Sequence, residues 1–354
     1  MSIKKIAELA GTSPATVSRV LSTPDHRCQT PGLSESIWRI AKELHYLPNT
    51  AAQELRKGST TCPAPFSVDI FLTRFDSLDK DPFFRELYVY IQDELQKNGC
   101  LLGEMLSTVD ILHTNADSSS HIIPYKTPQL VENEKNSHTP AYISRKSNTG
   151  LIILGKCPPE LIAFAKKRYS YITGIDRNPT NYEYDEVICS GESAAKTAVE
   201  YLISLGHKKI AYIGDCSYEA RYIGYYQSLI SHNLLLDYSN IYPASQTSEE
   251  GMKTMELILQ RDSLPTAIFC ANDSTALGVF DCLRHRRKKG YVPSIISIDN
   301  IRESEQTKPM LTTIDIPKEE MAHHAVKLLL DRIHNGHNSA ARIELPCKLL
   351  VRES

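Results

Sequence analysis

The sequences SIKKIAELAGTSPATVSRVLS at residues 2–22 and SESIWRIAKELHYLPNTAAQELRKG at residues 34–58 decide the fold of the first part of this chain. A predicted helix in the first run stops at Gly11, a residue type that commonly ends helices. Ser13 then caps a second helix that has Pro14 in its first turn, where a missing N–H costs little. Two short helices joined by a glycine-containing turn indicate a helix-turn-helix, whose second helix fits the DNA major groove.

The apolar spacing predicts which side of each helix faces inward, because residues three and four apart share one face. The predicted core positions are Ile6, Leu9 and Ala10 in the first helix, Val17, Val20 and Leu21 in the second, and Ile37, Ile40, Ala41 and Leu44 in a third helix that opens at Ser34. These three helices therefore form a small all-α head over residues 1–48.

The second helix carries the residues predicted to contact DNA. Arg19 can make a paired contact to guanine, Ala15 offers apolar contact to a thymine methyl group, and Pro14 lies beside them. Hydroxyl groups are better matched to phosphate, which positions a protein without specifying sequence. The hydroxyl residues in this interface are Thr12, Ser13, Thr16 and Ser18.

Composition indicates an ordinary globular protein of two or three domains, with 354 residues, 41% of them hydrophobic, and a formal net charge of −2. Residues 1–60 hold eight Lys and Arg against five Asp and Glu, a local excess of three positive charges that suits phosphate. No apolar run reaches the roughly 20 residues of a membrane span. The nine scattered cysteines and the absence of a secretion signal predict a reducing, cytoplasmic setting.

After a linker at 59–67, short apolar runs alternate with helical stretches, which predicts parallel sheets covered by helices on both faces. The predicted strands are Val68–Leu72, Leu151–Leu154, Tyr171–Ile175, Lys209–Ile213, Ala267–Cys270 and Ile295–Ile298, with a weaker strand near Leu101–Met105. The predicted helices are Phe84–Lys97, Glu192–Leu205, Ser248–Gln260 and Ser274–Lys288. Six or more such units suggest two doubly wound sheets, which bind ligands at the carboxyl ends of their strands.

The segments ATVSRVL at 15–21 and ELHYLPNTAAQELRKGST at 43–60 resemble the LacI/GalR family of bacterial repressors, and the resemblance covers nearly the whole chain. It implies a periplasmic-binding-protein-like core at 67–354 made of two subdomains, one at about 67–178 and 310–336 and the other at about 179–308 and 338–354. It also implies a homodimer on double-stranded operator DNA, with no membrane and no cofactor. One departure is Cys189-Ser190, which replaces an aspartate usual in the family.

Residues 49–66 are interpreted as a hinge helix and linker. Asn49 can cap a helix from Thr50 to Lys57, and eight residues are too few for a stable isolated helix in water. The resemblance implies that the helix orders on DNA, that Leu55 of two subunits wedges into a minor-groove base step, and that Asn49 and Ala52 contact the groove or backbone.

The resemblance places four effector contacts at strand ends or close after them, and adds an aromatic ring. They are Asp176, Arg221, Asn272 and Asp299, with Phe83 as the ring that stacks on a sugar. Asp, Asn and Arg can form paired hydrogen bonds to neighbouring hydroxyls. Taken singly, each has a plainer interpretation, because Asp and Asn end strands in many turns.

The segments DPFF, LIILGK and IAYIGD most resemble family members that control β-galactosidase genes, which favours a galactoside effector that induces transcription. The alternative is a sugar-binding or sugar-processing protein without control of DNA. Asp176 and Asp299 could form the carboxylate pair of a glycosidase. No strained nucleophile turn, phosphate loop or metal-ligand cluster supports catalysis, so the sequence predicts a protein that is not an enzyme.

Overall fold

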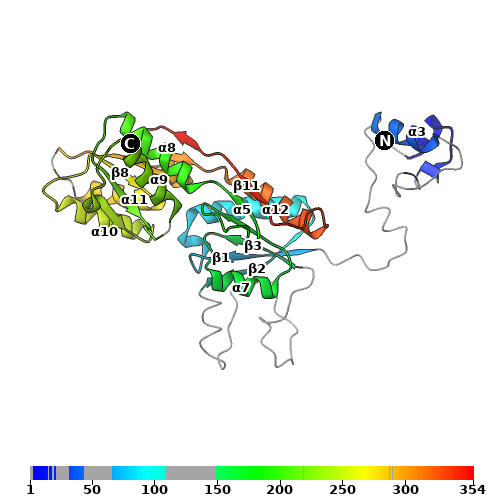
Figure 1. Ribbon diagram of the computed structural model, residues 1–354, viewed down its shortest axis with the longest axis horizontal. Helices are drawn as coiled ribbons and strands as arrows, with labels where there is room; N and C mark the ends of the chain where they lie inside the picture. The colour runs from blue at the N-terminus through cyan, green and yellow to red at the C-terminus, as the bar shows by residue number, and fades with distance from the viewer. Residues whose placement is uncertain are drawn as a thin grey trace, which may run out of the picture. The chain divides into compact units, whose positions relative to one another are not determined.

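The chain divides into two compact units, Met1–Ala64 and Pro65–Ser354 (Figure 1). The computed structural model describes residues 3–14, 16, 17, 20, 32–43, 66–108, 149–217, 219–286, 288 and 290–354. Residues 109–148, which cover most of the polar segment after the predicted strand near Leu101, lie outside that description.

The first unit is a helical head with a small core of its own. Helix α1 spans Ile3–Leu9, a second helix begins at Pro14, and α3 spans Leu33–Glu43. Its buried apolar side chains are Ile6, Ala7, Val17, Val20, Ile37 and Ile40. The predicted inward face of α1 is wrong at one position, since Leu9 is 55% exposed and Ala7 is buried in its place. The α1 face that meets the core is therefore rotated away from Leu9.

The turn between the first two helices has the predicted geometry. Gly11 has a φ of +61°, a left-handed conformation that glycine adopts without steric penalty. The Ser13 hydroxyl accepts a hydrogen bond from the Thr16 backbone N–H at 3.1 Å and so caps the second helix. Together with the three-helix core, this confirms the helix-turn-helix.

The second unit holds two six-stranded sheets. In the first sheet, in spatial order, lie β11 (Arg342–Glu344), β5 (Asp185–Ile188), β4 (Ile172–Asp176), β3 (Thr149–Leu154), β1 (Ser67–Leu72) and β2 (Leu101–Ser107). In the second lie β12 (Lys348–Leu350), β10 (Thr312–Asp315), β9 (Ser294–Asp299), β8 (Ala267–Cys270), β6 (Ile210–Gly214) and β7 (Ile241–Pro243). Every neighbouring pair is parallel except β10 with β12.

Helices cover both faces of each sheet, because successive strand residues point to opposite sides. In β3, Ile152 and Leu154 pack toward α5 (Pro82–Lys97) and α12 (Lys318–Ile333), while Leu151 and Ile153 pack toward α7 (Pro159–Arg168). Figure 1 shows α5 and α12 on one side of this sheet and α7 on the other. We call this sheet with its three helices the first lobe.

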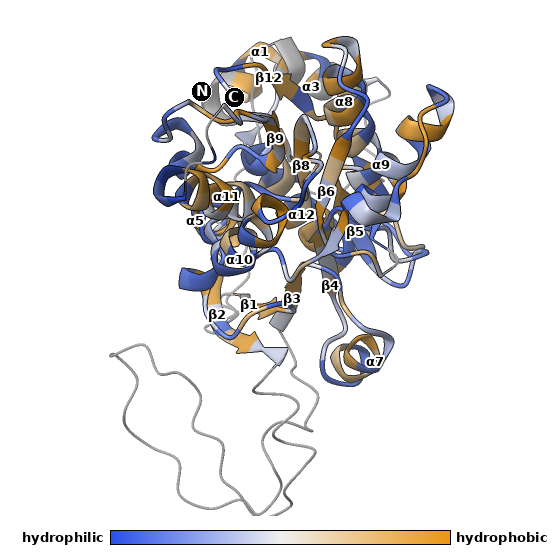
Figure 2. Cartoon of the chain, turned by 90° about the vertical axis from the view of Figure 1, so that its left-hand side faces the viewer, coloured by the Kyte–Doolittle hydropathy of each residue, from blue (hydrophilic) through white to orange (hydrophobic). Residues whose placement is uncertain are grey.

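The second sheet follows the same rule. Ile210 and Tyr212 of β6 pack with the large core that includes α8 (Gly191–Ser204) and α9 (Ala220–Ser231), while Ala211 and Ile213 pack with α10 (Ser248–Leu259) and α11 (Asp273–His285). The central strands β6 and β8 appear hydrophobic in Figure 2. This sheet and its four helices form the second lobe. Short 3-10 turns add η1 (Leu78–Lys80), η2 (Tyr238–Asn240) and η3 (Arg302–Glu305).

Three crossovers join the lobes, and each lies some residues beyond the predicted boundary. The first follows β5 at Cys189, the second lies between β10 and α12 at Ile316-Pro317, and the third follows β11 at Leu345. The predicted boundaries at 178–179, 308–310 and 336–338 are therefore corrected. The predicted boundaries place strands β5, β10 and β11 in the wrong lobe. Each is only three or four residues long, and its pairing with a neighbouring strand, rather than its own composition, determines the sheet to which it belongs.

We expect Gly278→Ala to destabilise the second lobe. Glycines let α10 and α11 cross closely: a Cβ at Gly278 would lie 1.9 Å from the Ser248 carbonyl oxygen, and one at Gly251 would lie 2.2 Å from the Thr275 carbonyl oxygen. Alanine gains about 1 kcal/mol of helix propensity but forces the backbones apart at a larger cost, so we expect a net loss of about 2 kcal/mol in urea unfolding. Asp281→Ala on the same helix is the control, and equal midpoints for both variants would contradict the close crossing.

Candidate functional site

A cavity of about 540 Å³ lies between the two lobes, at the carboxyl ends of their parallel strands. This is the position where open parallel sheets bind ligands, because the loops that follow the strands converge there. Residues from both lobes line it: Thr73, Arg74, Phe84, Gly155, Lys156, Asp176, Arg177, Asn178, Asp215, Glu219, Arg221, Pro243, Ala244, Ser245, Gln246 and Glu250. The volume falls in the usual range for a small-molecule site.

Polar contacts from the first lobe reach the second lobe around this cavity. Arg74, which follows β1, donates to the main-chain oxygens of Ser245 at 2.6 Å and Gln246 at 2.9 Å. Lys156, which follows β3, donates to the Ser217 oxygen at 3.1 Å. The width of the cavity is therefore linked to the relative position of the lobes.

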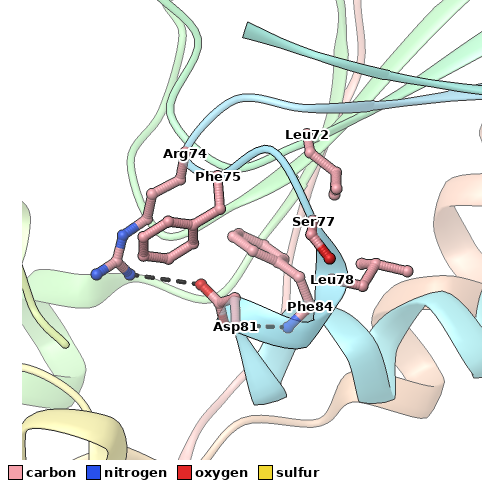
Figure 3. A pocket seen from close by; sticks show the side chains of 7 residues that line it. All are labelled: Leu72, Arg74, Phe75, Ser77, Leu78, Asp81 and Phe84. Atoms are coloured by element: carbon pink, nitrogen blue, oxygen red, sulfur yellow. Dashed lines mark hydrogen bonds and ion pairs between the residues drawn. The ribbon is translucent and has the colours of Figure 1, made fainter. Parts of the chain in front are cut away.

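Arg74 also borders a narrow crevice that shares Phe84 with the main cavity. Figure 3 shows its guanidinium directed toward Asp81, at 3.5 Å, with the ring of Phe75 beside it at 4.7 Å from the guanidinium carbon. Asp81 caps α5 by accepting from the backbone N–H groups of Phe83 and Phe84. Burial lowers the pKa of Arg74, and the opposing effect of the Asp81 carboxylate offsets only part of that change. Arg74 is thus held by the start of α5 on one side and by the second lobe on the other.

Arg221 and Glu219 form a buried ion pair in the cavity wall. The Nε of Arg221 donates to Glu219 at 2.8 Å, and its two terminal nitrogens donate to the Ala271 oxygen and the Gln246 side chain, each at 2.9 Å. Burial would raise the pKa of Glu219, but Arg221 outweighs burial and holds the pKa at about 2. The pair therefore stays charged, and the guanidinium is fixed in one orientation.

Arg177 and Asp299 form a second buried ion pair, which joins the end of β4 to the end of β9 across the lobes. The Arg177 guanidinium lies over the Phe83 ring, 4.1 Å from its centre. The Nε of Arg177 is buried without a protein partner. A buried donor without a partner is uncommon in folded proteins, and this one belongs to a residue of the cavity wall.

Asp299 has an unusual backbone for a non-glycine residue, with a φ of +133°. The Nζ of Lys318 donates to its carbonyl oxygen at 2.7 Å and helps to hold this conformation. Strained conformations persist where the surroundings fix them, and they cluster at functional sites. Burial raises the pKa of Asp299, and the charges of Arg177 and Arg221 oppose that rise.

The predicted effector residues fall into two groups. Asp176 and Arg221 line the cavity, and burial raises the pKa of Asp176. The structure places Phe83, Asn272 and Asp299 behind the cavity surface: Phe83 underlies Arg177, and Asp299 is paired with Arg177.

Asn272 acts as the helix cap that its residue type commonly provides, because its side chain accepts from the Thr275 backbone N–H at 3.0 Å. Its amide also donates to the Gln246 oxygen at 3.0 Å. Phe84, next to the predicted Phe83, is the aromatic side chain on the cavity surface.

Sequence reasoning missed several lining residues, chiefly Arg74, Lys156, Arg177 and Gln246. Arg74 and Lys156 follow β1 and β3 by two residues, so a basic side chain just after a predicted strand is the signal that could have found them. Gln246 comes from the loop after β7, a three-residue strand that gives little sequence signal. Its φ of +60° turns the loop back toward Arg221.

In the helical head, the described part of the DNA-binding prediction lies at the start of the second helix. Ser13 and Pro14 are exposed, and Thr12 and Thr16 are half-buried. Ala15, Ser18, Arg19, Asn49, Ala52 and Leu55 lie outside the described residues.

No helix among the described residues is long and apolar enough to cross a membrane. In the same part of the chain, no group of three or more His, Cys, Asp or Glu side chains is arranged to hold a metal ion.

Comparisons with known proteins match both units. Residues 2–49 match the model of bacterial regulatory proteins of the lacI family, and residues 199–354 match a periplasmic-binding-protein-like domain. The transcriptional repressor PurR of Aliivibrio salmonicida is 26% identical over 361 residues, covering 99% of this chain and 98% of its own. The repressor CytR of Escherichia coli K12 is 28% identical over 364 residues, covering 99% and 95%.

Solved structures share the fold. A complex of the regulator CelR with cellobiose covers 100% of this chain and 99% of its own, with a TM-score of 0.67 and 20% identity. A lac repressor dimer bound to operator and the anti-inducer ONPF covers 100% and 98%, with a TM-score of 0.62 and 21% identity. At these identities the likeness concerns the fold: a helix-turn-helix unit and a core of two parallel-sheet lobes.

Proposed function

We propose that this chain, which belongs to the LacI family of bacterial regulatory proteins, is a cytoplasmic, homodimeric repressor of carbohydrate-utilisation genes, controlled by a small sugar in the cavity between its lobes. The observation that carries the proposal is that polar bonds between the lobes surround that cavity. A ligand that competes for these bonds changes the preferred position of the lobes. Such a ligand binds one arrangement of the lobes more tightly than the other, and this difference in affinity is what allosteric control requires.

The chemistry of the cavity supports a neutral, hydroxyl-rich ligand. Four basic residues line it (Arg74, Lys156, Arg177, Arg221) and four acidic ones (Asp176, Asp215, Glu219, Glu250), so the formal charges cancel. Carboxylates, amides and guanidinium groups supply both acceptors and donors for hydroxyl groups, and Phe84 adds an apolar surface. Among sugars we favour a galactoside, on the strength of the segments DPFF, LIILGK and IAYIGD.

The similar proteins bind different ligands. Cellobiose is bound in the CelR structure, and ribose is bound in a LacI-family regulator of Enterococcus faecium. The repressors PurR, CytR and MelR are all similarly distant from this chain, at 26–28% identity. The effector of this chain therefore has to be found by binding measurements.

In the proposed mechanism, two helical heads read the two halves of a near-palindromic operator. Arg19, Ala15 and Pro14 meet base edges, and Leu55 of each subunit enters the minor groove from the hinge helix. Sugar binding moves the lobes, the hinge helices lose their order, and DNA affinity falls by a coupling free energy of about 1–3 kcal/mol.

The test selects DNA with the full-length protein from a random duplex library, and then measures affinity with and without galactose, methyl β-galactoside, lactose, cellobiose and ribose. We expect an inverted repeat whose affinity falls roughly 5- to 150-fold with a galactoside. Leu55→Ala should lower affinity for the repeat, whereas Lys253→Ala, at a side chain of α10 that is 58% exposed, should not. Failure to select any sequence, or turnover of a galactoside, would overturn the proposal.

A further inference from the structure

Two cysteines lie on neighbouring crossovers between the lobes. Cys189 directly follows β5, and Cys347 is the last residue before β12 in the segment that leads from β11. These crossovers are joined by parallel pairing of β5 with β11, in which Ile188 is the partner of Glu344, and by a hydrogen bond from the Leu345 N–H to the Ile188 oxygen at 2.9 Å. Both thiols are free, and both side chains pack in the same apolar cluster.

The two thiols interact electrostatically and differ in exposure. Cys189 is fully buried, whereas Cys347 is half-buried. The neighbouring Cys347 thiol and burial raise the pKa of Cys189, while the Cys189 thiol lowers the pKa of Cys347. Cys347 is therefore the more reactive thiol toward an oxidant from solvent, because the thiolate is the nucleophile.

We propose that Cys189 and Cys347 form a reversible disulfide under peroxide, which locks two of the three crossovers together. The Cys347 thiolate attacks one oxygen of hydrogen peroxide, the O–O bond breaks, and hydroxide leaves to give a sulfenic acid and, after protonation, water. The Cys189 sulfur then attacks the sulfenic sulfur, the S–O bond breaks, and a second water leaves. Two thiols are oxidised and one peroxide is reduced to two waters.

The cross-link would act next to the ligand cavity. The Cys189 N–H donates to the carbonyl oxygen of Asp176, a cavity residue, at 3.3 Å. Rotation of the lobes must be absorbed by the few residues of the crossovers. A covalent bond between two crossovers restricts that rotation, so the oxidised protein should respond less to its effector. This last consequence rests on the proposed function, whereas the disulfide itself does not.

The test treats the reduced, full-length protein with hydrogen peroxide and analyses tryptic peptides without reduction. We expect one linked pair, residues 178–196 joined to 343–348, which dithiothreitol separates. Cys282→Ser, at a buried cysteine of α11, should keep the link. Cys189→Ser should abolish the link and leave a sulfenic acid on Cys347 that dimedone traps, whereas Cys347→Ser should leave no trapped adduct on Cys189.

Loss of the thiols without the linked peptide, or a linked peptide found only in a covalent dimer, would overturn the proposal. A second measurement compares the effect of galactoside on DNA affinity before and after oxidation. We expect oxidation to reduce that effect at least severalfold, with recovery in dithiothreitol and no change in Cys347→Ser. Formation of the link in a protein that binds no DNA would defeat the proposed function but not the disulfide.

Discussion

Arg221→Ala is expected to abolish the response to effector and to lower the free energy of unfolding by about 3–5 kcal/mol. The arginine is buried and makes three kinds of contact: an ion pair with Glu219, a bond to the Ala271 oxygen and a bond to Gln246. Its removal leaves the buried Glu219 carboxylate without its ion-pair partner, and this loss of compensation is the main source of the destabilisation. Urea unfolding and sugar titrations of DNA affinity measure the two effects.

Two further variants distinguish the effect of breaking the buried ion pair from the effect of simply removing a positive charge. Arg284→Ala removes an arginine whose side chain is 56% exposed and which lies 3.5 Å from Asp281, so it should cost less than about 1 kcal/mol. The double variant Glu219→Ala with Arg221→Ala should be more stable than Arg221→Ala alone, because the Glu219 carboxylate no longer remains buried without its partner. A double variant as unstable as the sum of the single ones would show that the two residues act independently.

The second large effect concerns pH. Asp273 is completely buried at the start of α11, where burial and then the charge of Asp299 raise its pKa to about 7 from the ordinary value of 3.8. Between about pH 4 and pH 7 the folded state therefore binds more protons than the unfolded state. The contribution of Asp273 to the free energy of unfolding falls as pH rises through that window and is constant above it. The difference between the two pKa values corresponds to about 4 kcal/mol.

We therefore expect Asp273→Asn to gain stability relative to the natural chain as pH rises from 4 to 7. The amide keeps an oxygen for the hydroxyl groups of Ser297 and Thr313, which bond to Asp273 at 2.5 and 2.7 Å. It loses the acceptor for the Ile301 N–H, a loss that does not depend on pH. Urea unfolding at several pH values tests this, with Ser274→Ala as a control that keeps the natural slope. A constant difference between Asp273→Asn and the natural chain would contradict the raised pKa.

The sequence predicted the helical head, the two doubly wound sheets and the edge at which the cavity lies. These features depend on local patterns: a capping serine before a proline, an apolar face at helical spacing, and apolar runs that alternate with helices. Strands β1, β3, β6, β8 and β9 are strongly apolar and fall where the pattern indicates. The exposed Leu9 shows the limit of this reasoning, because the burial of a helix face depends on the helices packed against it.

Other features depended on tertiary contacts. The crossovers follow from pairing of short strands, such as β11 with β5, that carry little signal of their own. Phe84 rather than Phe83 meets the cavity because the rotation of α5 is set by its packing on the first sheet and on α12. Asn272 caps helix α11, and Arg177 forms an ion pair with Asp299 of the other lobe. A residue type at a strand end indicates where a site lies, but the partners of its side chain depend on segments far away in the sequence.

For this protein, the sequence alone determined the class of each unit and the side of the sheets on which a ligand binds, because periodicity, capping and strand direction are properties of short segments. Only the tertiary structure decided which charged groups face each other across the cavity and which two cysteines meet at the crossovers. Those pairings join residues more than 100 positions apart, such as Cys189 with Cys347, and depend on how two sheets are brought together.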